Sequence, residues 1–304
     1  MADVYLKIES ISKSFGNFKA VDTLSLEVPP GSVYGILGPN GAGKTTTIRM
    51  ILNIIIPDSG RIEVGGKPFA EELKKQIGYL PEERGIFKKM KILDLLGYFG
   101  ELKGLSSKES KRRGSEWAER LGLKDWLKKK GEELSKGMQQ KAQFICTVLH
   151  EPKLLILDEP FSGLDPINMD LLKDIMLELK AKGSTVLFST HQMDHAEKLC
   201  EYICLINRGH KILDGSLKEI KSRHGKSSLA VSIEGDSAYL ASLSGVARVD
   251  DYGPYKELRL SNGGNPQKLL QEISARSVVH RFELMEPSLH NIFIESVKTS
   301  EAAR

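Results

Sequence analysis

The sequence is poor in cysteine, and this scarcity excludes a disulfide-stabilised fold. Its 304 residues include three cysteines, an odd number that favours a reducing compartment. Cys200 and Cys204 could be metal ligands, but no third or fourth ligand stands near them in a recognisable spacing. We therefore expect these two residues to be buried thiols.

The sequence also lacks long apolar runs and an N-terminal leader. No run approaches the about 18 apolar residues that a membrane-spanning helix needs. Met1–Ser10 carries charged residues where a secretory signal would have an apolar segment. We expect a soluble chain, whose role at a membrane would come through a partner.

Neither sign of charge is in large excess. The 44 Lys and Arg residues against 40 Asp and Glu residues give a net charge of +4, which is too mild to indicate a nucleic-acid-binding protein. Basic residues cluster only locally, at 88–91, 111–113 and 128–130. Each cluster is either a solvated helix face or an approach to anionic lipid or partner loops. No nucleic-acid partner is expected.

The apolar patterns predict an α/β protein. Strands are predicted at 4–15, 24–28, 32–37, 61–66, 77–81, 154–158, 185–189, 202–207 and 210–215. Helical spacing occurs at 45–55, 171–183 and 191–200. The block from about 88 to 150 is helical throughout and more charged than its flanks, which indicates an inserted helical subdomain. Strands that alternate with helices favour a mainly parallel sheet.

The composition changes after 221–226, and a smaller domain is predicted at about 225–304. Strand patterns occur at 228–235, 247–253, 255–262 and 278–284, and helix patterns at 237–243, 266–277 and 288–297. The order is βαββαβ followed by a last helix. This order predicts a small α+β ferredoxin-like domain.

The segment GPNGAGKT matches the phosphate-binding pattern G-x-x-x-x-G-K-[ST] in full. It follows a predicted strand and opens a predicted helix, as the pattern requires. Glycines let the backbone approach phosphates, and the helix start directs N–H groups at them. We expect Lys44 to reach the β- and γ-phosphates and Thr45 to give a hydroxyl to Mg²⁺. The predicted phosphate-binding residues are Gly38, Pro39, Asn40, Gly41, Ala42, Gly43, Lys44, Thr45 and Thr46.

The segment LLILDEP ends a buried strand in two carboxylates, Asp158 and Glu159. Such a strand brings its last residues to the sheet edge where ligands bind in open α/β folds. Asp158 is predicted to bind Mg²⁺, directly or through water, and Glu159 to polarise the attacking water. His191 follows the strand at 185–189. We expect it to hydrogen-bond the γ-phosphate and to orient Glu159 or the water.

The segment LSKGMQQK (134–141) holds no acid, histidine or nucleophile. Locally it is a helix start capped by Ser135. Together with GPNGAGKT, LPEE, LLILDEP, SGLD and STH, however, it occurs in the order and spacing of one family. Over residues 1 to about 220 the chain resembles the nucleotide-binding subunit of an ABC transporter.

The resemblance implies a P-loop NTPase of ABC type, with a mainly parallel core sheet, an antiparallel β subdomain and an inserted helical subdomain. It also implies ATP and Mg²⁺, and a homodimer that sandwiches ATP. LSKGMQQK resembles the family signature LSGGQ, so Ser135 and the N–H of Gly137 would contact the γ-phosphate held by the other copy. A separate transmembrane permease subunit would hold the homodimer at the cytoplasmic side of the cell membrane.

The sequence departs from the family pattern at several positions. Lys136 stands in place of the first signature glycine, and Met138 in place of glutamine. Glu82 replaces a glutamine that ligates Mg²⁺ or water, and a glutamate can also coordinate Mg²⁺. We expect function to be kept with altered metal dependence. Phe15 stands where the family places an aromatic on adenine, and Phe18 is the competing candidate.

Residues 225–304 resemble an accessory domain of bacterial exporter ATPases of the sodium-export type, recognisable from EPSLHNIF at 286–293. We expect a regulatory or dimer-supporting module. The predicted function is the ATP-hydrolysing subunit of an ABC transporter, an exporter by resemblance. The substrate depends on the membrane subunit, so sodium ions, drugs and lipids stay open.

The alternative is a soluble ABC ATPase that acts in DNA repair or on the ribosome. DNA-repair members interrupt the domain with long coiled coils, and translation factors usually carry two such domains. This sequence shows one ATP-binding domain of this type and no long coiled coil. A non-hydrolysing binding module is disfavoured because Lys44, Asp158, Glu159 and His191 are all present.

Overall fold

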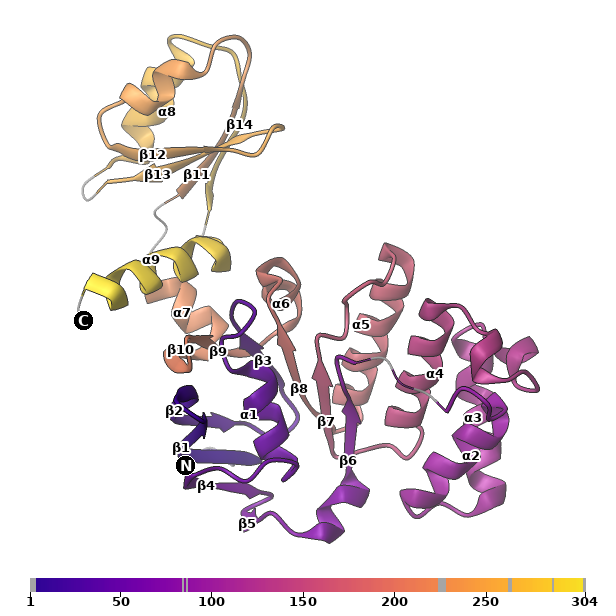
Figure 1. Cartoon of the computed structure of the whole chain (residues 1–304). Coiled ribbons are helices and arrows are strands. Elements are labelled where there is room, and N and C mark those ends of the chain that lie inside the picture. The colour runs from indigo at the N-terminus through magenta and orange to yellow at the C-terminus, as the bar shows by residue number, and fades with distance from the viewer. Residues whose placement is uncertain are drawn as a thin grey trace. The chain divides into compact units, whose positions relative to one another are not determined.

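The computed structural model describes residues 4–83, 85, 87–223, 228–261, 264–285 and 287–302. The chain divides into two compact units, Met1–Ser216 and Leu217–Arg304, and each is described by itself (Figure 1). Glu286, the first residue of the segment that suggested the accessory domain, lies outside the described residues.

A six-stranded sheet forms the centre of the larger unit. Its strands are β3 (Val33–Leu37), β6 (Ile77–Leu80), β7 (Leu154–Asp158), β8 (Thr185–Thr190), β9 (Tyr202–Asn207) and β10 (His210–Ser216). The spatial order is β10-β9-β3-β8-β7-β6, with β10 antiparallel to β9 and all other pairs parallel. Every residue of β3, β7 and β8 is buried, as in parallel strands covered on both faces. The mainly parallel core sheet is therefore confirmed.

A second sheet of the larger unit is antiparallel, as expected. It consists of β1 (Leu6–Phe15), β2 (Phe18–Val28), β4 (Ser59–Val64) and β5 (Lys67–Pro68), in the order β2-β1-β4-β5. Leu6 and Ile8 of this sheet belong to one buried cluster with Tyr34 and Ile36 of the core sheet. The two sheets therefore share a core. The short β5 lies outside the predicted strands.

The helices of the larger unit are α1 (Lys44–Ile51), α2 (Ile92–Leu102), α3 (Ser107–Arg120), α4 (Lys136–Val148), α5 (Pro166–Ala181) and α6 (Met193–Leu199). Of these, α2, α3 and α4 lie within the predicted helical block. The start of α5 precedes the predicted residue 171, because the Asp165 side chain accepts a hydrogen bond from the N–H of Asn168 at 3.0 Å and caps the helix. Short 3₁₀ turns lie at Glu71–Gln76, Lys124–Trp126 and Gly131–Glu133.

The smaller unit contains four strands and three α-helices among its described residues. They are α7 (Leu217–Arg223), β11 (Ser228–Ile233), β12 (Val246–Asp251), β13 (Lys256–Leu260), α8 (Pro266–Ser274), β14 (Val279–Met285) and α9 (Leu289–Ala302). The sheet order β12-β13-β11-β14 is antiparallel throughout, which matches the ferredoxin-like prediction. The first predicted helix, 237–243, is only a 3₁₀ turn, Ala238–Ser242.

The three cysteines have the surroundings expected of thiols outside a disulfide framework. All three cysteines are free and buried, as predicted for Cys200 and Cys204, and burial raises the pKa of each thiol. Within the described ranges, no group of three or more His, Cys, Asp and Glu side chains could hold a metal ion. None of the described helices is both long and apolar enough to cross a membrane.

Candidate active site

The predicted phosphate-binding loop lines an open pocket of about 420 Å³ beside the ends of the core strands. The loop connects β3 to α1. The pocket brings together nine predicted site residues, which come from the loop, the first turn of α1, the segment after β6 and the residue after β7. Its lining residues are Phe18, Ala20, Asn40, Gly41, Ala42, Gly43, Lys44, Thr45, Thr46, Glu82 and Glu159.

The backbone of the loop requires glycine where the helix begins. Gly43 is the N-cap of α1 and has a φ of +105°, a conformation that side chains strongly disfavour. A Cβ atom there would lie 2.5 Å from the carbonyl oxygen of Ala20. Gly43 thus lets the helix start pack against β2 and turn its N–H groups toward the pocket.

Lys44 is held among oxygen atoms of the loop and the neighbouring strand. Its side chain is only 6% exposed. The ammonium donates to the carbonyls of Gly38 and Pro39 at 2.8 and 3.2 Å and lies 3.3 Å from Oε1 of Glu159. A buried ammonium with oxygen partners on several sides is suited to exchange them for phosphate oxygens.

Glu159 joins Lys44 to His191. Its Oε1 atom lies 3.0 Å from Nδ1 of His191, whose side chain is partly exposed beside it. The backbone of Glu159 has a φ of +48°, which is uncommon for a residue with a side chain and typical of functional sites. The structure therefore brings together the predicted base, the histidine and the lysine.

Asp158 is 1% exposed, and its two carboxylate oxygens have different surroundings. Oδ1 accepts a hydrogen bond from the hydroxyl of Ser189, whereas Oδ2 is buried without a hydrogen-bond partner among the described residues. Burial raises the pKa of Asp158, while the hydroxyls of Ser189 and Thr45 act in the opposite direction. A free carboxylate oxygen near a hydroxyl, with Glu82 at the pocket, is a set of hard oxygen ligands that suits Mg²⁺.

The two candidate aromatics lie together where β1 turns into β2. Phe15 and Phe18 are paired across this hairpin, and both are exposed. Phe18 is among the residues that line the pocket, whereas the ring of Phe15 lies 6.0 Å from the ammonium of Lys13. The geometry leaves both as candidates for contact with a base.

The segment 134–141 starts α4 as predicted. Ser135 is the N-cap, and its hydroxyl accepts a hydrogen bond from the N–H of Met138 at 3.3 Å. No atom lies within 4 Å of the position that a Cβ atom on Gly137 would occupy. None of the described residues that line the pocket comes from this segment. Ser135 is exposed and Gly137 is partly exposed.

Two buried polar residues of the site escaped the sequence analysis. Ser189 reaches Asp158 from β8. Gln140 of α4 donates to the carbonyl of Pro160 at 3.1 Å and so connects the signature helix to the residue after Glu159. Both lie within segments that carry the family resemblance, LSKGMQQK and STH, but the sequence analysis gave neither residue a role of its own.

Comparison with known proteins identifies the family. The family described as ABC transporter matches residues 21–162, and the one described as ATP-binding protein DrrA1-3-like, C-terminal domain, matches residues 215–297. The ABC transporter ATP-binding protein YhaQ of Bacillus subtilis (strain 168) is 45% identical over 292 residues, which cover 96% of this chain and 98% of YhaQ. The linearmycin resistance ATP-binding protein LnrL of the same organism is 32% identical over 301 residues, which cover 95% of this chain and 97% of LnrL.

A solved structure agrees with these relatives. It is described as the ATP-binding subunit of an ABC transporter and has a TM-score of 0.68 and 32% identity, with 73% of this chain and 93% of that chain covered. These proteins are transporter components, and nothing among them supports the alternative in DNA repair or on the ribosome. The chain belongs to the ATP-binding subunits of ABC transporters, which are ATPases that work with transmembrane subunits.

Proposed function

We propose that two copies of this chain bind ATP between them and hydrolyse it at the site built around Lys44, Glu159 and His191. The observation that supports this most directly is the chain of contacts from the Lys44 ammonium through Glu159 to His191, with separations of 3.3 and 3.0 Å. It combines a cation for phosphate oxygens with a carboxylate for a water molecule. Both are groups that in-line hydrolysis of a γ-phosphate uses.

Each residue has a distinct role in this proposal. Lys44 leaves the carbonyls of the loop and binds β- and γ-phosphate oxygens, where it stabilises developing charge. Glu159 accepts a hydrogen bond from the attacking water and polarises it. His191 holds the Glu159 carboxylate and donates toward the γ-phosphate. Thr45, Asp158 and Glu82 would hold Mg²⁺, which when bound neutralises charge on the phosphate oxygens.

The rest of the nucleotide site follows from the resemblance. Phe15 would stack on adenine, with Phe18 beside it at the pocket. Ser135 and Gly137 would cap the γ-phosphate bound by the other copy, since the start of an α-helix of this length directs N–H groups and a positive dipole end outward. Their position outside the chain's own pocket fits a contact in trans.

The homodimer would work on the cytoplasmic side of the cell membrane, attached to a separate permease, and would drive export. The support is comparative: LnrL is named for resistance to linearmycin, and the smaller unit matches a DrrA-like domain. Removal of a toxic compound from a cell is an export function. The transported compound is determined by the membrane subunit.

The test uses a tagged Glu159→Gln variant, with Glu101→Gln as a matched control on an exposed part of α2. Loss of the carboxylate that polarises water should reduce phosphate release by about 10²–10⁴-fold and trap an ATP-bound dimer, measured by light scattering.

The same tagged chain, recovered from gently solubilised membranes, should carry a polytopic membrane protein. A variant that stays monomeric with ATP and Mg²⁺ would contradict the sandwich, and recovery with ribosomes or DNA alone would contradict transport.

A further inference from the structure

Ser189 occupies a central position under the site, although it lines no part of the pocket. It lies on β8 directly beside Asp158 in the parallel ladder with β7, and it is fully buried. Its hydroxyl forms hydrogen bonds with two groups at the C-terminal end of β7. It donates to Oδ1 of Asp158 and accepts from the backbone N–H of Glu159 at 3.1 Å.

The direction of these two bonds follows from the donor inventory. A serine hydroxyl has one proton and two lone pairs. The N–H of Glu159 can only donate, so it uses a lone pair of the hydroxyl, and the single proton goes to Asp158. Oδ1 of Asp158 is thereby occupied, and Oδ2 is the oxygen without a hydrogen-bond partner in the part of the chain that the structure describes. Ser189 thus selects which oxygen of Asp158 is available.

The second bond supports an unusual backbone. Glu159 has a φ of +48°, in a region that residues with a side chain rarely occupy unless the surroundings hold them there. Its N–H is held both by the Ser189 hydroxyl and by the Ser189 carbonyl oxygen, at 3.1 and 3.2 Å. This turn sets the direction in which the Glu159 carboxylate leaves the strand toward Lys44 and His191.

We propose that Ser189 is a positioning residue that orients Asp158 toward Mg²⁺ and Glu159 toward the attacking water. The inference rests on the proposed function, and it gives a role to Ser189, the residue of the STH segment to which the sequence analysis assigned none. Groups that hydrogen-bond a metal-binding carboxylate typically change metal affinity or activity by about 10–100-fold when removed. Ser189 affects two functional groups through one hydroxyl.

The experiment compares equilibrium binding of a fluorescent ATP analogue with Mg²⁺ and with EDTA. For Ser189→Ala, the gain in affinity that Mg²⁺ provides should fall about 10–100-fold, while binding in EDTA stays unchanged. The kcat of hydrolysis should fall with it, and Ser189→Thr, which keeps a hydroxyl, should recover most of both. Ser184→Ala is the matched control, because Ser184 is also buried beside β8 and donates to the carbonyl of Pro152 at 2.7 Å, at the other end of the strand.

The outcomes separate this inference from the proposed function. Unchanged binding in EDTA shows that a variant is folded, so a lost Mg²⁺ effect in Ser189→Ala alone supports the positioning role. An equal Mg²⁺ effect in wild type and Ser189→Ala, or the same loss in Ser184→Ala, would overturn it. If the wild-type chain binds the ATP analogue equally well with Mg²⁺ and with EDTA, both the proposed metal site and this inference are overturned.

Discussion

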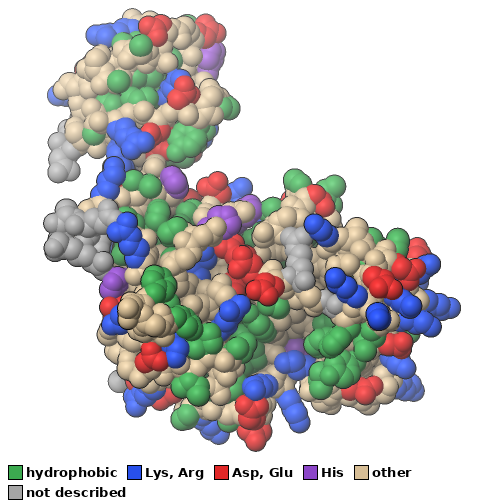
Figure 2. Space-filling view, viewed as in Figure 1, with side chains coloured by type: hydrophobic (Ala, Val, Ile, Leu, Met, Phe, Trp, Pro, Cys, Tyr) green, Lys and Arg blue, Asp and Glu red, His purple; other side chains and the backbone are tan. Residues whose placement is uncertain are grey.

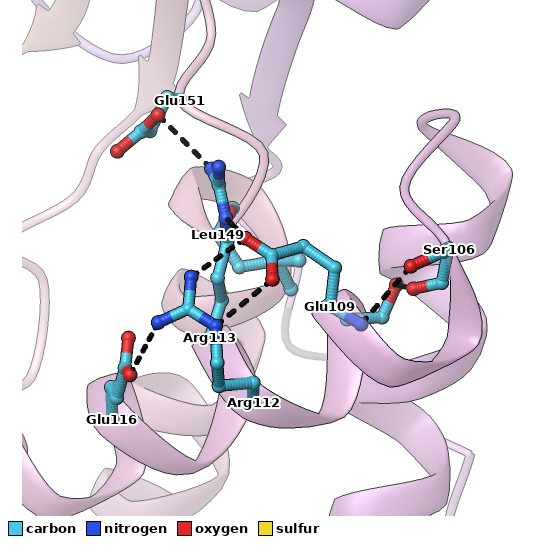
Figure 3. A network of polar contacts seen from close by, with 8 residues as sticks. Ser106, Glu109, Arg112, Arg113, Glu116, Leu149 and Glu151 are labelled. Carbon is cyan, nitrogen blue, oxygen red and sulfur yellow. Dashed lines mark hydrogen bonds and ion pairs between the residues drawn. The ribbon is translucent and has the colours of Figure 1, made fainter.

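Charge is arranged differently at the active site and on the surface of α3. At the active site, Lys44 and Glu159 are buried and share a few contacts. On and beside α3, a set of ion pairs and hydrogen bonds that we call the α3 network is drawn in Figure 3; its charged side chains are 25–59% exposed. Its members are Ser106, Glu109, Arg112, Arg113, Glu116, Leu149 and Glu151. Figure 2 shows blue and red side chains interspersed on the right of the larger unit, where Figure 1 labels α3.

The two regions differ in what the loss of one partner leaves behind. In the α3 network, a carboxylate that loses its arginine is rehydrated, because exposed ion pairs are screened and contribute little. At the active site, a carboxylate that loses Lys44 stays buried with an uncompensated charge. The burial of a charged pair therefore predicts its contribution to stability better than the number of its contacts does.

The largest effect is expected for the pair of Lys44 and Glu159. Lys44→Met should lower the free energy of unfolding by roughly 3 kcal/mol in the absence of nucleotide, since it leaves Glu159 buried without its cation. The double variant Lys44→Met/Glu159→Gln should lose less than the sum of the single changes, with a coupling of about 1–3 kcal/mol. Urea unfolding followed by fluorescence reports on the larger unit, because both tryptophans, Trp117 and Trp126, lie there.

Additive effects in this cycle would mean that the 3.3 Å separation carries no interaction energy. Lys74→Met serves as the control, since this lysine pairs with Glu71 and both side chains are exposed. It should change the unfolding midpoint little, as expected for a surface ion pair.

A second effect, which reaches a similar size only at low pH, depends on the titration of a buried histidine. His150 follows α4, and neither of its buried ring nitrogens has a hydrogen-bond partner among the described residues. Burial first, and then the charge of Lys103, lower the pKa of His150 from 6.5 to about 4. The unfolded chain therefore binds a proton more readily, so the contribution to stability is complete above about pH 6.5 and is lost as the pH falls toward 4. Across that window the loss is about 3 kcal/mol.

His150→Gln removes this titration. Its stability should fall less steeply between pH 6.5 and 4 than that of the wild type, as measured by urea unfolding at several pH values. At pH 7.5 the two proteins should differ by a constant amount that reflects packing alone. Parallel curves through the whole range would show that His150 titrates normally and is hydrated.

Sequence reasoning was strongest where one local pattern fixes both structure and chemistry. The glycines and lysine of the phosphate loop are such a pattern, and so are the apolar runs of β3, β7 and β8, which parallel strands buried on both faces require. The local signals were weaker at element ends. Helix α1 stops at Ile51 instead of 55, because Asn53 adopts a φ of +54°, which an α-helix cannot continue.

The contacts that sequence reasoning missed are set by register between distant segments. Ser189 lies beside Asp158 because β7 and β8 pair in one register, although 31 residues separate them. Nothing in TVLFS distinguishes a serine under a carboxylate from a serine in any buried strand. The sequence also cannot decide between Phe15 and Phe18 as the adenine contact. The two residues are paired where β1 ends and β2 begins.

The smallest effects should separate two neighbouring arginines of the α3 network. Arg112 is 53% exposed, and its ion-pair partners among the described residues, Glu109 and Glu116, both lie on its own helix. Arg113 is 25% exposed and reaches the Leu149 carbonyl and Glu151 beyond α4. Arg113→Ala should cost about 1 kcal/mol, because it removes a contact between separate segments. Arg112→Ala should leave the urea midpoint unchanged at high salt, where exposed pairs are screened. If both variants lose the same stability at high salt, the number of contacts and not their burial determines their contribution. The contrast with the buried active site would then be wrong.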